Sequence, residues 1–532
     1  MDFGIAQLLI IIFITSFLIR AAPVIIYGYP IDSKDTVDNT INMLYLPKYP
    51  IVMLNYDRTG TYAALDPVLK SLSYRFYLQD NPPFFYLTVG GLANLILPFT
   101  KGVNSGFLAT AIVYSFLPII LFLFLRFVTR DNILSFFGGL ILAISPSTLR
   151  HLFNGDWALI TGSMLFLLSI FLSIKYIHNP QRKNFFLLLL SLVFMITCYV
   201  PYIFPYAISM VFYSATRRNK KPIFKVLSKI FILSVLISIP FLINFINSYL
   251  ISEVPAQQSA VYLTEILEIL ALSNILLIFS AAGAIGILIS FIKRFKIEES
   301  IQIFTPVIGI LLFFLLGDIF LHLSSYPNRV FSSSTPIIIA LLSSYAVYFF
   351  YEYIVRFLNT EHRLNKIVAT PTSRPVFTGI LVILIFAASI GPLSFMFDIK
   401  PFLTNDKYDA LQWIRNNTEK DSTVYFIGFF SHWKSFSYRN ATNMFQQEVG
   451  GRIQWTANLI EGFNADYIVL SPQIFRTGYA PKIIEIAKLF NSLNIPIVYG
   501  NGNVLIFQIK PEQRQQFKNR IETPNNITVG DE

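Results

Sequence analysis

The sequence predicts a polytopic α-helical membrane bundle of about eleven spans, followed by a C-terminal α/β soluble domain. Three observations lead to this fold class. Of the 532 residues 54% are hydrophobic and only 13% are charged, whereas a soluble domain averages about 25% charged residues. Apolar runs long enough to cross a bilayer recur from residue 3 to residue 397. Residues 398 to 510 lack such runs and mix helical with strand-like patterns.

The first apolar run, Phe3 to Ile19, is predicted to be a membrane helix. It has neither the basic start nor the small-residue cleavage site of a secretory signal. We expect residues 20–104 to form a long first outer loop. Within this loop, residues 84–99 begin after two prolines and contain a Gly-Gly pair, so we expect them to rest at the membrane surface without crossing.

The distribution of charge supports that interpretation. If residues 84–99 do not cross, later spans fall near 106–125, 132–147, 158–174, 185–199, 201–215, 226–246, 266–292, 301–317, 336–355 and 376–397. With the N-terminus inside, basic residues then fill the cytoplasmic loops around 126–130, 175–183, 217–225, 293–296 and 356–374, and the short outer loops hold only Arg150 and Arg329. This is the positive-inside pattern. Nucleic-acid binding is excluded, because it would need a continuous basic surface with interleaved aromatic residues.

Two domains follow from these patterns, a transmembrane domain at 1–397 and an outer domain at 398–510. The outer domain is predicted to have helices at 408–415 and 481–493 and strands at 423–427, 465–470, 495–499 and 504–509. The polar tail at 511–532 is predicted to be disordered. The single cysteine, Cys198, excludes a disulfide framework and a zinc-finger type of site.

Acidic residues in the first outer loop are the first candidates for chemistry. Asp35 and Asp38 are three residues apart, so on a helix they would share one face. Such a pair suits general-base catalysis or a divalent cation, Mg²⁺ or Mn²⁺. The alternative is a solvated first turn of a helix, where aspartate favours the helix dipole.

A second candidate group lies in the short outer loop after the third span. It holds Arg150, His151 and Asp156 at one membrane border. Asp156 is a candidate catalytic residue and metal ligand, and the alternative for it is a plain helix cap. Arg150 and His151 are candidate substrate-binding residues, with a packed histidine as the alternative for His151.

Three further residues complete the candidate set. Glu265 and Glu268 lie in or beside the outer loop before the eighth span and are candidate substrate-binding residues, because a carboxylate near the bilayer is costly. The alternative for Glu268 is a residue at the start of a helix near the level of the lipid headgroups. Arg329 lies at the outer end of the tenth span. It could bind a phosphate with two nitrogens, or extend toward lipid headgroups.

The order of these motifs resembles the GT-C superfamily of polyprenyl-phosphate-dependent glycosyltransferases, in particular archaeal oligosaccharyltransferase-like membrane proteins. The resemblance rests on Asp35 in the first outer loop, on Asn81-Pro82-Pro83, on Arg150 with Gly155-Asp156, and on Pro327-Asn328-Arg329. The start of the outer domain, Ala410 to Thr418, is similar as well. The segment from Gly428 to Lys434 differs from the family's WWDYG motif.

The resemblance implies an integral cell-membrane enzyme of archaeal type that transfers sugar at the outer face. The donor would be a sugar on polyprenyl (dolichyl) phosphate, held by Arg329, and Asp35 would act on a lipid, glycan or protein acceptor. Two alternatives stay open: an oligosaccharyltransferase with a diverged acceptor site, and a noncatalytic lipid or glycan transporter or scaffold. In most predicted spans the centre is free of ionisable side chains, which favours an enzyme acting at the membrane border over a transporter.

Overall fold

The structure, a computed structural model, describes most of the chain. The described residues are 4–31, 36, 39, 40, 43, 44, 83–217, 220–251, 274–294, 296–320, 326–360, 383, 387, 390, 392–394, 398–401, 403–427, 440–443, 448, 449, 452, 453, 464–471, 480–501 and 503–522. They fall into two compact units, one that ends at Lys400 and another that contains all described residues from Pro401 onward.

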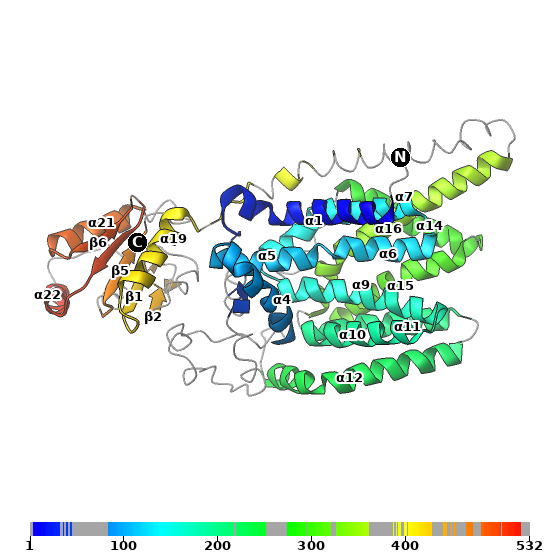
Figure 1. Cartoon of the computed structure of the whole chain (residues 1–532), viewed down its shortest axis with the longest axis horizontal. Helices are drawn as coiled ribbons and strands as arrows, with labels where there is room; N and C mark the ends of the chain where they lie inside the picture. Colours follow the sequence, from blue (N-terminus) through cyan, green and yellow to red (C-terminus); the bar gives the residue numbers. More distant parts are fainter. Residues whose placement is uncertain are drawn as a thin grey trace. The chain divides into compact units, whose positions relative to one another are not determined.

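The first unit is a bundle of helices, many of which run side by side (Figure 1). Its elements are α1 (Ile5–Tyr27), α4 (Pro83–Ile96), η4 (Leu97–Phe99), α5 (Gly102–Tyr114), α6 (Leu117–Thr129), α7 (Asn132–Ile144), α8 (Ser147–Phe153), α9 (Trp157–His178), α10 (Arg182–Cys198), η5 (Val200–Tyr202), α11 (Ile203–Ala215), α12 (Lys220–Ile251), α14 (Asn274–Ile292), α15 (Ile297–Phe314), η7 (Leu315–Phe320) and α16 (Tyr326–Thr360).

Six helical segments in the described part are long and apolar enough to cross a membrane. They are Ile5–Tyr27, Gly102–Thr129, Trp157–His178, Pro222–Pro240, Ile297–Gly317 and Tyr326–Glu352. Shorter apolar helices lie at Phe85–Phe99, Asn132–Ile144, Val200–Ala215 and Leu276–Ile292. Each predicted span from 106–125 to 336–355 overlaps helical residues, while residues 266–273 and most of 376–397 lie outside the described residues. The count of about eleven crossings therefore stays a prediction.

Helices α9 and α16 form the centre of the bundle. Of the most apolar 18-residue window in each, 94% is buried within the protein, compared with 28% in α1 and 22% in the span of α12. Apolar side chains such as Ile14 and Leu236 point outward, 50% and 55% exposed. A helix that is apolar on its outer surface is typical of contact with lipid.

The predicted span at 106–125 is two helices in the structure, because the helix breaks at Ser115 and Phe116 between α5 and α6. Pro118 explains the break. Proline has no N–H to donate to the carbonyl of residue 114, and its ring clashes with that carbonyl in a continuous helix.

The predicted surface segment, 84–99, is the short helix α4 followed by η4. With 14 residues α4 is about 21 Å long, shorter than the roughly 30 Å hydrocarbon core of a bilayer. In Figure 1 it runs across the direction of α5 and α10 at one end of the bundle. Its exposed Leu95 and the exposed Phe99 of η4 would suit an interfacial position.

The second unit contains a five-stranded sheet in the order β2-β1-β5-β7-β6. Its elements are α19 (Asn405–Asn417), β1 (Thr423–Ile427), β2 (Asn440–Asn443), β3 (Glu448–Val449), β4 (Arg452–Ile453), β5 (Tyr467–Leu470), α21 (Ala480–Ser492), β6 (Ile497–Gly500), β7 (Leu505–Gln508) and α22 (Pro511–Glu522). Strand β1 pairs in parallel with β2 and β5, and β6 and β7 form the predicted antiparallel hairpin. Phe490 of α21 packs against Phe507 of β7 in the core.

The prediction of disorder over 511–532 is wrong for residues 511–522, which form helix α22. The helix is tied to the sheet by Arg514, whose guanidinium donates to the Asp466 carboxylate at 2.7 Å and to the Ala465 carbonyl at 3.2 Å. Burial raises the pKa of Asp466, but hydrogen bonds from Thr423 and Arg514 outweigh it and hold that pKa below its usual value. The polar composition of 511–532 predicts disorder, and it gives no sign of the contact between Arg514 and Asp466.

Candidate functional site

The turn between α8 and α9 places two candidate residues side by side. The amide of Asp156 donates to the carbonyl of His151 at 3.0 Å, and the amide of Gly155 donates to the carbonyl of Leu152 at 3.4 Å. This pair of bonds, with Gly155 at φ +85°, is a Schellman motif at the end of α8. Glycine suits this position because a side chain is strained in the left-handed region. The turn therefore returns the chain so that residues 151 and 156 meet.

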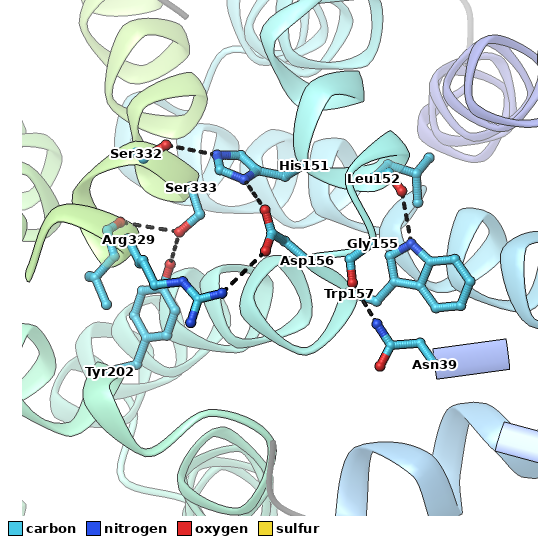
Figure 2. A network of polar contacts seen from close by, with 11 residues as sticks. Asn39, His151, Leu152, Gly155, Asp156, Trp157, Tyr202, Arg329, Ser332 and Ser333 are labelled. Carbon is cyan, nitrogen blue, oxygen red and sulfur yellow. Dashed lines mark hydrogen bonds and ion pairs between the residues drawn. The ribbon is translucent and has the colours of Figure 1, made fainter. Parts of the chain in front are cut away.

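The side chains of His151 and Asp156 also meet directly. His151 Nδ1 lies 2.9 Å from Asp156 Oδ2, and His151 Nε2 lies 2.9 Å from Ser332 Oγ on α16. Because a carboxylate can only accept, the Nδ1–H of the imidazole donates to Asp156, and Nε2 pairs with the serine hydroxyl. His151 is 2% exposed. It thereby joins the α8–α9 turn to α16 (Figure 2).

Arg329, near the start of α16, forms the second connection to the same carboxylate. Its Nη2 lies 3.5 Å from Asp156 Oδ1, and 23% of its side chain is exposed, compared with 15% for Asp156. Arg329 and Ser332 are three residues apart, so they share one face of α16. Asp156 sits at the N-cap position of α9, but its side chain makes no capping hydrogen bond. The carboxylate is engaged by His151 and Arg329 instead of by the helix end.

The charges around Asp156 favour its ionised form. Burial raises the pKa of this carboxyl, but the hydrogen bond and charge of His151, together with Arg329, outweigh burial and leave the pKa below its ordinary value. Asp156 is therefore an anion at neutral pH. Held between a histidine and an arginine, it is suited to orienting these two groups.

Hydroxyl groups continue the polar wall along α16. Ser333 and Ser334 lie 2.7 and 2.9 Å from the hydroxyl of Tyr202, which comes from η5. All three side chains are buried, and Figure 2 shows Ser333 and Tyr202 beside Arg329. The start of α16 thus presents one guanidinium next to several buried hydroxyls.

The first outer loop reaches the same turn through Asn39. Its Nδ2 donates to the Gly155 carbonyl at 2.6 Å, and its Oδ1 accepts from the hydroxyl of Tyr86 on α4 at 2.5 Å. Asn39 is buried. The sequence had not marked this residue as functional, although it directly follows the acidic cluster that ends at Asp38.

The structure brings together His151, Asp156 and Arg329 from the predicted set. Arg150 shares α8 with His151 and is partly exposed. The other four candidates, Asp35, Asp38, Glu265 and Glu268, lie outside the described residues. Ser332 was not predicted, because a serine in an apolar helix carries no signal for a partner 181 residues away.

No cluster of three or more His, Cys, Asp or Glu side chains that could hold a metal ion occurs within the described ranges. Asp156 is the candidate metal ligand that falls inside them, and its two oxygens contact a histidine and an arginine. A cation there would need further carboxylates, and the other predicted metal ligand, Asp35, lies outside the described residues. The described residues therefore supply part of a ligand set at most.

A second ionic cluster lies at the opposite end of α9. Glu298 accepts from Arg217 at 2.8 Å and lies 3.2 Å from Nε2 of His178, the last residue of α9. Because α9 has 22 residues, this cluster is about 33 Å from Asp156 along the helix axis. The two clusters mark two ends of the bundle that are separated by roughly the thickness of a membrane.

Comparison with solved structures shows a similarity of fold. The chain is similar to the archaeal oligosaccharyltransferase AglB from Archaeoglobus fulgidus, whose structure was solved in complex with an inhibitory peptide and a dolichol-phosphate. The TM-score is 0.51 at 13% sequence identity, covering 96% of this chain and 74% of that chain. No protein-family model and no curated protein matches the sequence. The resemblance expected from the motifs is thus confirmed for the fold.

Proposed function

We propose that this protein is a membrane glycosyltransferase that moves a sugar from a polyprenyl (dolichyl) phosphate to an acceptor at the outer membrane face. The observation that supports this most is the placement of Arg329 against Asp156 at one end of the bundle. A partly exposed guanidinium oriented by a carboxylate is suited to hold a phosphate at the membrane border. The related fold of a protein solved with dolichol-phosphate agrees with this donor.

The proposed reaction inverts the configuration at the sugar carbon. The acceptor hydroxyl forms a new bond to that carbon as the bond from the carbon to the phosphate oxygen breaks. Asp35 takes the acceptor proton, and the polyprenyl phosphate leaves with its negative charge stabilised by Arg329. Asn39, in the same outer loop of the sequence as Asp35, donates to the carbonyl of Gly155, so this loop reaches the turn that holds Asp156. Asp38, Arg150, Glu265 and Glu268 are proposed to line the same cavity.

The orientation in the membrane is part of the proposal. We place the N-terminus inside, about eleven crossings through a cell membrane of archaeal type, and the domain from Pro401 outside. The two ionic clusters at opposite ends of α9 support this assignment. Arg217 lies in a loop rich in basic residues, whereas the loop around Asp156 has few.

Arg329→Gln tests the proposed function against a matched control, Arg217→Gln. Both arginines are ion-paired with a carboxylate and are similarly exposed, at 23% and 20% of their side chains. Purified chain in lipid nanodiscs is given radiolabelled dolichyl phosphate mannose or glucose with membrane extract as acceptor. We expect Arg329→Gln to lower release of dolichyl phosphate about a hundredfold and Arg217→Gln to leave it within about twofold. Equal rates in the two variants would refute the assignment.

A divalent cation, Mg²⁺ or Mn²⁺, is proposed to be held by Asp35 with Asp156, where it would stabilise charge on the donor phosphate. Chelation with EDTA should then abolish sugar release, and Mg²⁺ or Mn²⁺ should restore it. Full activity after chelation would leave Asp156 with the orienting role alone.

An oligosaccharyltransferase with a diverged acceptor site is the second candidate. It is favoured by the inhibitory peptide bound to the similar protein. Transfer from a lipid-linked oligosaccharide to an Asn-x-Thr peptide would establish it. A transporter or scaffold would show neither sugar release nor peptide transfer with any of these donors.

A further inference from the structure

We infer that Arg20, in the first helix of the bundle, is a positioning residue for the site, and that it acts by fixing the start of α8 through Thr148. The link from this placement to sugar transfer rests on the proposed function. Arg20 makes no contact with His151, Asp156 or Arg329 in the described structure, so its effect has to pass through α8.

Arg20 is fully buried within the bundle. Its Nη1 donates to the carbonyl and the hydroxyl of Ser16 at 3.1 and 2.5 Å and to the Ala143 carbonyl at 3.3 Å. Its Nη2 donates to Thr148 Oγ1 at 3.1 Å. The guanidinium carbon lies 4.9 Å from the centre of the Tyr114 ring. One side chain thus contacts α1, α5, α7 and α8.

The charge of Arg20 is balanced by backbone carbonyls and hydroxyls, without a carboxylate partner in the described part of the chain. None of the ion pairs in the described part of the chain involves Arg20, and its Nε has no partner there. Ala143 belongs to the last turn of α7, where backbone carbonyls lack helical partners and the helix dipole is negative. A cation is favourable at such an end. An arginine on a membrane helix is otherwise costly, so we expect Arg20 to have a function.

Thr148 connects Arg20 to the helix that holds His151. Its hydroxyl accepts from Arg20 and donates to the Ser145 carbonyl at 2.7 Å. It lies in the first turn of α8, a helix of only seven residues. His151 is three residues further along, on the same side of that helix. Without the bond from Arg20, α8 loses its connection to α1 and can shift relative to α16, together with the imidazole that orients Asp156.

Two substitutions separate this role from simple loss of a buried hydrogen bond. Thr148→Val and Ser16→Ala each remove one buried hydroxyl that accepts from Arg20. Only the first removes the connection to α8, whereas the second leaves Arg20 tied to Ala143 and Thr148. Thr148→Ser keeps the hydroxyl and serves as the rescue variant.

The readout is the reactivity of His151 with diethyl pyrocarbonate, measured peptide by peptide in the full chain in nanodiscs. In the wild type both ring nitrogens of His151 are hydrogen-bonded and buried, so labelling is slow. His178, 36% exposed at the far end of α9, is the internal reference. We expect labelling of His151 relative to His178 to rise about tenfold or more in Thr148→Val, and less than twofold in Ser16→Ala and Thr148→Ser.

Arg20→Lys completes a double-mutant cycle with Thr148→Val. An ammonium cannot reach acceptors on α1, α7 and α8 in the planar arrangement of a guanidinium. If Thr148 acts through Arg20, the two changes together raise the labelling of His151 no more than either alone. If the increase in His151 labelling in the double variant equals the product of the two single increases, Thr148 acts only through Ser145. This outcome would overturn the inference. Equal labelling in Thr148→Val and Ser16→Ala would overturn it too.

Binding of dolichyl phosphate to the same samples distinguishes this inference from the proposed function. We expect about tenfold weaker binding in Thr148→Val and unchanged binding in Ser16→Ala. If the wild type binds no dolichyl phosphate, the proposed donor is wrong, and the labelling of His151 still decides the role of Arg20. If Thr148→Val raises labelling but binds dolichyl phosphate as tightly as the wild type, Arg20 does not position the donor site.

Discussion

Replacement of Asp156 by asparagine removes the charge that connects α8, α9 and α16 while preserving the size of the side chain. His151 and Arg329 contact different oxygens of Asp156, and asparagine replaces one of these oxygens by an NH₂ group that cannot accept. A hydrogen bond to an ionised group contributes about 1.5–3 kcal/mol, and a partly exposed ion pair adds at most about 1 kcal/mol. We expect Asp156→Asn to lower the free energy of unfolding by about 2–4 kcal/mol.

Cys198 provides the assay for this prediction. It is the single cysteine of the chain and is 3% exposed, so a thiol-reactive fluorescent dye reports when the bundle opens. Glu298→Gln is the control, since Glu298 also contacts a histidine and an arginine but is 54% exposed. The midpoint of unfolding should fall clearly in Asp156→Asn and only slightly in Glu298→Gln.

The pH dependence provides the decisive part of the test. Because the folded state lowers the pKa of Asp156, the ionised carboxylate stabilises the fold above the ordinary carboxyl pKa of about 4. That contribution is lost as the pH falls through the lower pKa of the folded state. The difference between wild type and Asp156→Asn should therefore be full at pH 7 and shrink below about pH 4. A pH-independent difference, or one no larger than that of Glu298→Gln, would refute the proposed network.

Three further predictions concern local structure. Gly155→Ala places a side chain at φ +85° and should lower the free energy of unfolding by about 1–2 kcal/mol. Labelling of His151 by diethyl pyrocarbonate should also become faster. Gly283→Ala would put a Cβ against the Leu342 carbonyl of α16 and should abolish folded, monodisperse protein in size-exclusion chromatography, whereas Gly91→Ala, with open space around it, should not. Arg514→Met should increase hydrogen exchange in α22 while leaving exchange in α19 unchanged.

Much of the fold follows from local patterns in the sequence. Strand β1 has the predicted bounds, 423–427, because its signal, a short apolar run with β-branched residues, lies within the segment. Strand β2, at Asn440–Asn443, was not predicted, since Asn-Ala-Thr-Asn has no hydrophobic alternation and is positioned by pairing with β1. Helix α22 was mistaken for a disordered tail for a similar reason, as one arginine holds it to the sheet.

The candidate site shows the same division between local and long-range information. The run from His151 to Asp156 contains Asn-Gly, a signal for a helix end, so the contact between these two residues is encoded within six positions. The sequence marked Arg329 as well, but pairing of Arg329 with Asp156 and of Ser332 with His151 depends on how α16 packs. Arg20 looked like the end of the first span, and only the structure shows that it is buried among four helices.

The central claim is that Arg329 holds the phosphate of a lipid-linked sugar donor. Electron cryomicroscopy of the full chain in nanodiscs with dolichyl phosphate tests it most directly. The account predicts phosphate density within hydrogen-bond distance of the Arg329 guanidinium, with the prenyl chain leading into the surrounding lipid. Phosphate density at the opposite end of α9, beside Arg217 and His178, would contradict it.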